Sequence, residues 1–149
     1  RRVALTSVRT ALNGYQKGRC FYCFADIAVN GEDVISTDVD HFFPLVLADA
    51  EPSLASVLNG VWNLVLACRT CNRGVNGKFA RVADIRYLTR LHTRNSFLIE
   101  SHHPLRQTLM EQTGTSDRER VAFLRDMDHR AITHLLFRWT AAHEHEPAF

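Results

Sequence analysis

The sequence predicts an α+β fold, in which two short strands and a brief helix precede a region built of helices. Segments 37–42 and 63–67 have the length of short strands and are flanked by turn-forming residues. Beyond residue 81, apolar residues recur every three or four positions, the spacing of one helix face. The chain has 149 residues, 46% hydrophobic and 23% charged, which is typical of a globular domain with its own core.

The N-terminal elements follow from local signals. Residues 3–16 carry apolar side chains at helical spacing and predict a lead-in helix that ends at Gly18. Asn30-Gly31 predicts a turn between short extended segments at 24–29 and 33–35.

The middle of the chain contains the two strands. The strand at 37–42 ends before Pro44, and residues 45–60 form a connection to the strand at 63–67. A brief helix is expected over 71–77, because the two glycines within it make a longer helix costly.

The C-terminal half is predicted to be helical. One helix covers 83–93, and a second opens at Pro104 and ends at Gly114. Thr115-Ser116 supplies an N-cap for a long final helix. Apolar residues continue at helical spacing from this cap to Ala142, as a face that packs on the core or on a partner. Residues 143–147 are expected to fray.

Four cysteines form two Cys-x-x-Cys pairs, Cys20/Cys23 and Cys68/Cys71. Each pair can chelate one ion from a single turn, and four thiolates favour a closed, structural Zn²⁺ site. Two disulfides, or four independently buried cysteines, are the alternatives. No segment resembles an export signal or a membrane span, so we expect a cytoplasmic protein and favour zinc.

Positive charge is concentrated just after the second cysteine pair. Residues 69–94 contain seven Lys and Arg and one acid, Asp84, although the net charge of the whole chain is only +2. Arg86, Arg90 and Arg94 are four residues apart and share one helix face, which is either a solvated surface or a phosphate contact. The candidate nucleic-acid contacts are Arg69, Arg73, Lys78, Arg81, Arg86 and Arg90.

Asp40-His41 lies between the cysteine pairs, and Asn72 directly follows the second pair. An acid and an amide oxygen suit a hard divalent ion, and an imidazole can activate a water. Neighbouring strand residues point to opposite faces, so Asp40 and His41 can share one centre only where the strand twists or ends. Taken alone, the dipeptide fits a structural hydrogen-bonded pair as well.

Three stretches together resemble the HNH endonuclease family. These are Cys-Phe-Tyr-Cys at 20–23, Asp-Val-Asp-His-Phe-Phe-Pro at 38–44, and Trp-Asn-Leu-Val-Leu-Ala-Cys-Arg-Thr-Cys-Asn-Arg-Gly at 62–74. Their order is that of the family, with Lys78 further on. The resemblance covers 19–78 and does not extend into the helical region.

The resemblance implies a ββα-metal core and a role for each matching residue. His41 would be the general base, and Asn63 would hold the loop and orient that base. Asp40 and Asn72 would bind one catalytic ion, Mg²⁺ or Mn²⁺. A histidine often stands at the position of Asn72 in the family, and the neutral amide oxygen here favours hard ions over zinc.

We therefore expect three regions: a lead-in helix at 1–18, an HNH core with its zinc site at 19–80, and a helical extension at 81–149 packed on that core. The expected function is metal-dependent hydrolysis of DNA, gripped mainly by its phosphate backbone. A bacterial or phage restriction or defence setting fits the family, with further domains or a homodimer as partners.

Two other classes of function remain open. A zinc-dependent DNA-binding module without catalysis would need only the cysteines and the basic segment. A protein-interaction domain would use the final amphipathic helix and keep the HNH core as a scaffold. Neither explains why an acid, an imidazole and two amides accompany the cysteines.

Overall fold

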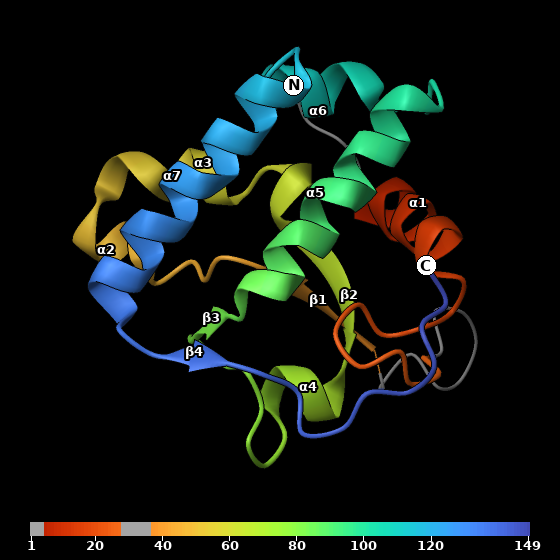
Figure 1. Ribbon diagram of the computed structural model, residues 1–149, viewed down its shortest axis with the longest axis vertical. Helices are drawn as coiled ribbons and strands as arrows, with labels where there is room; N and C mark the ends of the chain where they lie inside the picture. The colour runs from red at the N-terminus through yellow and green to blue at the C-terminus, as the bar shows by residue number, and fades with distance from the viewer. Residues whose placement is uncertain (1–4, 28–36) are drawn as a thin grey trace.

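The computed structural model describes residues 5–27 and 37–149 (Figure 1). The elements in chain order are α1 (Leu5–Gln16), β1 (Thr37–His41), α2 (Leu47–Ala50), the 3-10 helix η2 (Pro52–Leu54), α3 (Ala55–Leu58), the 3-10 helix η3 (Val61–Asn63), β2 (Leu64–Cys68), α4 (Arg69–Arg73), β3 (Val82–Ala83), α5 (Ile85–Glu100), α6 (Arg106–Thr113), α7 (Asp117–Leu135) and β4 (Arg138–Trp139). The fold is mixed α and β, as the sequence predicts.

β1 and β2 form an antiparallel pair at the centre of the molecule. Thr37 lies opposite Cys68, and His41 lies opposite Leu64. α4 follows β2 without a linker, and the Cys68 sulfur accepts the Cys71 amide at its N-terminus. Both strands and the brief helix are confirmed, although the helix begins at Arg69 and ends before Gly74.

The connection predicted at 45–60 is more structured than expected, since it contains α2, η2 and α3. The turn predicted at Asn30-Gly31 lies outside the described residues. The described part of the preceding segment forms no strand, only a bridge between Arg19 and Asp26.

α5 lies across the β1–β2 pair (Figure 1). Its Arg94 is fully buried and donates to the carbonyl oxygens of Leu64 (2.9 Å) and Trp62 (3.1 Å). One apolar cluster runs from Val8 in α1 to Trp139 in β4, so the C-terminal helices share their core with the strands. Among the described residues, no helix is long and apolar enough to cross a membrane.

α7 begins at the predicted cap. The Ser116 hydroxyl accepts the Glu119 amide, and the Glu119 carboxylate accepts the Ser116 amide. The prediction that the final helix continues to Ala142 is wrong, because α7 ends at Leu135. Trp139 instead belongs to β4, which pairs in parallel with β3.

The C-terminal segment after β4 is packed rather than frayed. In Figure 1 it crosses from β4 to the side of the molecule that carries α1. The His145 amide donates to the Cys23 carbonyl at 2.7 Å, and the Phe149 ring packs against Tyr15, Phe21 and Phe24. Backbone hydrogen bonding and aromatic contact therefore attach this segment to α1 and to the turn formed by residues 20–24, the first cysteine knuckle.

Gln16, the last residue of α1, joins that helix to β2. Its buried side-chain amide donates to the Leu66 carbonyl at 2.8 Å and accepts the Leu66 amide at 3.0 Å. The same Leu66 carbonyl accepts the Phe21 amide at 2.9 Å. These bonds hold the first cysteine knuckle beside β2.

Candidate metal centre and catalytic site

The four cysteines come together in the structure. Their sulfur atoms all lie within 4.8 Å of one another, and none of the four is in a disulfide. The Cys23 and Cys68 sulfurs are 3.7 Å apart. Zn–S bonds of about 2.3 Å in a tetrahedron place sulfurs about 3.8 Å apart, so the cluster has the right size for zinc.

Hydrogen bonds among the four thiols lower the pKa of two of them and raise the pKa of the other two. Hydrogen bonds from Cys20 lower the pKa of Cys23 and Cys68, while hydrogen bonds from neighbouring thiols raise the pKa of Cys20 and Cys71. Backbone amides of Tyr22 and Cys71 also point at sulfurs, each at 3.4 Å. Two thiols with a lowered pKa and nearby amide donors are suitable surroundings for a cation bound by thiolates.

A second site lies at the end of β1. Asp40, His41 and Asn72, which the resemblance assigns to catalysis, line one surface depression of about 310 Å³. β1 supplies the acid and the imidazole, and α4 supplies the amide. The end of the strand allows the two neighbouring side chains to reach the same depression.

Asp40 is buried and fixed by two partners. Its Oδ2 accepts the Tyr22 hydroxyl at 2.6 Å and lies 3.2 Å from the Lys78 Nζ. Lys78 is itself fully buried and also donates to the His41 carbonyl at 3.1 Å. Burial lowers the pKa of Lys78, and the charge and hydrogen bond of Asp40 oppose that effect.

Asn72 is oriented by Asp38, two residues before Asp40 on the same face of β1. The Asn72 Nδ2 donates to the Asp38 Oδ2 at 2.9 Å, and Arg73 forms an ion pair with the same carboxylate. A carboxylate accepts but does not donate, so the Asn72 amide nitrogen must face Asp38. The Asn72 carbonyl oxygen is thereby left as the end that can bind a ligand.

His41 is partly buried beside these groups. Burial lowers the pKa of His41, and Lys78 adds to that effect. The charge of Asp40 and a hydrogen bond with the Asn59 side chain oppose it. A lowered pKa keeps the imidazole neutral near physiological pH, the form that accepts a proton.

Asn63 is fully buried and does not line the depression. Its Nδ2 donates to the carbonyl oxygens of Phe43 and Leu58, each at 2.9 Å, and its Oδ1 accepts the Phe43 amide at 2.8 Å. These contacts fasten the loop that follows His41. Asn63 is therefore a positioning residue rather than one that can touch a substrate.

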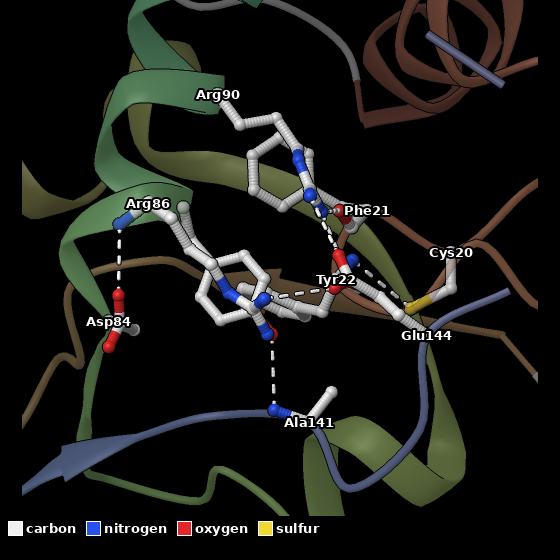
Figure 2. A network of polar contacts seen from close by, with 9 residues as sticks. Cys20, Phe21, Tyr22, Asp84, Arg86, Arg90, Ala141 and Glu144 are labelled. Carbon is white, nitrogen blue, oxygen red and sulfur yellow. Dashed lines mark hydrogen bonds and ion pairs between the residues drawn. The ribbon is translucent and has the colours of Figure 1, made fainter. Parts of the chain in front are cut away.

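The predicted basic contacts need correction. Lys78 is wrong as a phosphate contact because its side chain is fully buried. The predicted stripe of Arg86, Arg90 and Arg94 does not form one solvated face, because Arg86 is exposed whereas Arg90 is half-buried and Arg94 is fully buried. Figure 2 shows Arg90 donating to the carbonyls of Phe21 and Tyr22 (2.6 and 3.0 Å). The remaining predicted cations, exposed on the surface, are Arg69, Arg73, Arg81 and Arg86.

Arg86 and Arg90 both pair with Glu144 of the C-terminal segment, at 3.0 and 2.8 Å. Arg86 also donates to the Tyr87 hydroxyl, which in turn accepts the Ala141 amide (Figure 2). Arg90 therefore connects α5 to residues 21 and 22, and both arginines connect α5 to the C-terminal segment.

Sequence reasoning did not find two residues that contact this site. Tyr22 binds Asp40, and its place between the two knuckle cysteines was the available signal. Asn59 contacts His41, but its Asn-Gly pair indicated only a turn.

The chain matches no protein-family model, no curated protein and no solved structure.

Proposed function

We propose that this protein is a metal-dependent endonuclease of the HNH type that hydrolyses DNA phosphodiester bonds. The observation that carries the proposal is the convergence of Asp40, His41 and Asn72 on one depression. The β1–β2–α4 order, with its cysteine cluster at the helix start, supports it too, because the resemblance implies that arrangement.

The side chains suit a hard divalent ion. The contacts of Asp40 use Oδ2, so it would bind through Oδ1, and Asn72 would bind through its carbonyl oxygen. Oxygen donors of this kind are those of Mg²⁺ and Mn²⁺ sites. Such an ion, when bound, supplies positive charge for the phosphate and the leaving oxygen.

His41 would act as general base. Its neutral imidazole takes a proton from the water that attacks the phosphorus, and the leaving oxygen departs on the opposite side. Asn59 holds the ring, and Asn63 holds the backbone that follows it. The four cysteines would hold one structural zinc, which takes no part in the reaction because four thiolates close its coordination.

A plasmid-nicking assay with Mg²⁺, Mn²⁺ or EDTA tests this function. His41→Ala should slow nicking about 10²- to 10⁴-fold, the usual contribution of a general base, without loss of zinc. His129→Ala, which alters an exposed histidine on α7, is the matched control and should nick at the wild-type rate. Nicking by His41→Ala at the wild-type rate would exclude the proposed mechanism.

The same assay separates the other classes of function. DNA binding without nicking in any metal would indicate a zinc-dependent binding module, and neither binding nor nicking would indicate a protein-interaction domain. EDTA at a concentration that leaves the zinc bound should stop nicking, because the oxygen-ligand site is open to solvent and the thiolate site is closed.

A further inference from the structure

Phe79 is an exposed aromatic residue at the candidate catalytic site. It lines the same depression as Asp40, His41 and Asn72, and 56% of its surface is exposed. Among the residues that the structure describes, no other aromatic ring packs on it. The ring lies outside the apolar core and beside a polar site, so it is available to contact a ligand.

The backbone holds Phe79 in this exposed position. Its φ is 47°, in the left-handed region that bulky residues rarely adopt. Its amide donates to the carbonyl of Asn72 at 2.9 Å, and the preceding residue, Lys78, is anchored in the interior by Asp40. The ring is therefore tied to the same two residues that would bind the catalytic ion.

A second loop adds apolar surface to the same depression. Leu45 and Val46, which follow β1, are 44% and 41% exposed and line it together with Pro44. The depression thus combines an acid, an imidazole and an amide with an apolar rim. A nucleotide has the matching composition, a charged phosphate joined to a base with two flat apolar faces.

We propose that Phe79 stacks on an unpaired base next to the phosphate that is cut, so that the substrate is single-stranded or locally unpaired DNA. The inference rests on the proposed nuclease function and specifies its substrate. Inside a duplex, neighbouring base pairs cover both faces of each base, so a ring at the active site can stack only on a base outside the helix.

Binding measurements test the inference independently of cleavage. In the His41→Ala background, fluorescence anisotropy would compare a single-stranded oligonucleotide, a duplex with an unpaired bubble and a fully paired duplex. Phe79→Ala should weaken binding of the first two about 5- to 150-fold, the usual contribution of one stacked base. Binding of the paired duplex should change less than twofold.

Three further variants identify stacking as the cause. Phe79→Trp should bind like the parent, whereas Phe79→Leu, which keeps apolar area without an aromatic face, should resemble Phe79→Ala. Phe137→Ala is the matched control, since Phe137 is 69% exposed and does not line the depression. Circular dichroism and zinc content would verify that each variant is folded.

Equal losses on paired and unpaired DNA, or no loss on either, would overturn the inference. Binding by Phe79→Leu at the parent's affinity would overturn it as well, because apolar area without an aromatic face would then be sufficient. The nuclease proposal fails separately, on the absence of nicking by the wild-type protein. Nicking that is the same in the wild type and in Phe79→Ala would therefore be consistent with the nuclease function and would contradict only the stacking contact.

Discussion

A buried lysine is tolerable only when its charge is paired, and Lys78 meets this condition through Asp40 and the His41 carbonyl. The same contacts hold the two residues that would bind a metal and activate water. Lys78 therefore has a positioning role that is separate from any contact with DNA.

Replacement of Lys78 by Met should lower the free energy of unfolding by about 3–5 kcal/mol, because Asp40 would keep a buried charge without its cation. Urea unfolding followed by circular dichroism measures this change. Lys17→Met, at an exposed lysine, is the control and should change stability little. The double variant Lys78→Met/Asp40→Asn should recover part of the loss, and a double variant less stable than Lys78→Met would contradict the ion-pair account.

At this scale, residue type and spacing predicted the cysteine cluster, because two Cys-x-x-Cys pairs commonly bind one structural zinc ion. The sequence could not reveal that Lys78 is buried. A lysine among arginines predicts a surface cation. Lys78 can be buried because Asp40, which is distant in sequence, lies beside it in the fold and pairs with its charge.

Among the elements, the connection between β1 and β2 is held by the side chain of Asn63. Asn63 satisfies three backbone groups of this connection with one amide. Since the connection includes α2 and α3, this amide attaches a long segment of short helices to the end of β1.

Asn63→Ala should lower the free energy of unfolding by several kcal/mol, since each buried backbone group left unpaired costs about 1–3 kcal/mol. Nicking should also fall, because the loop after His41 loses its anchor. Asn13→Ala, in α1, is the matched control, since the buried Oδ1 of Asn13 has no hydrogen-bond partner among the described residues. Chemical unfolding of both variants would test this, and equal stabilities would contradict it.

Elements with strong local signals were predicted, and those set by tertiary contact were not. The Ser116 cap was recognisable because its partner Glu119 is three residues away. The end of α7 was not, because β4 forms by pairing with β3, more than fifty residues earlier in the chain. The 83–93 helix extends to Glu100 for a similar reason, since its inward face packs on other elements along its whole length.

In the whole molecule, the cysteine cluster connects parts of the chain that are far apart in sequence. It joins the knuckle after α1 to the start of α4, and the C-terminal segment then packs against that knuckle. The sequence indicated the first connection through its motif. It did not indicate the second, because the histidines and acids near the C-terminus resemble a solvated end.

If the four cysteines hold a structural zinc, as proposed, removal of that ion should unfold the protein. A structural zinc contributes about 10 kcal/mol or more, comparable to the ~5–15 kcal/mol by which whole domains are stable. Thermal unfolding, with metal content measured on the same sample, would compare the wild type with Cys68→Ser and with protein treated with a strong zinc chelator. Cooperative unfolding at an unchanged temperature in metal-free protein would contradict a structural zinc.

The Gln16 amide has a consequence for self-association. A sheet of two strands has backbone groups on its outer edges that could recruit a strand from another molecule. Gln16 occupies both groups of Leu66 on the edge of β2, much as one residue of a third strand would. The end of a helix thereby blocks a surface from which intermolecular β-sheet growth could begin.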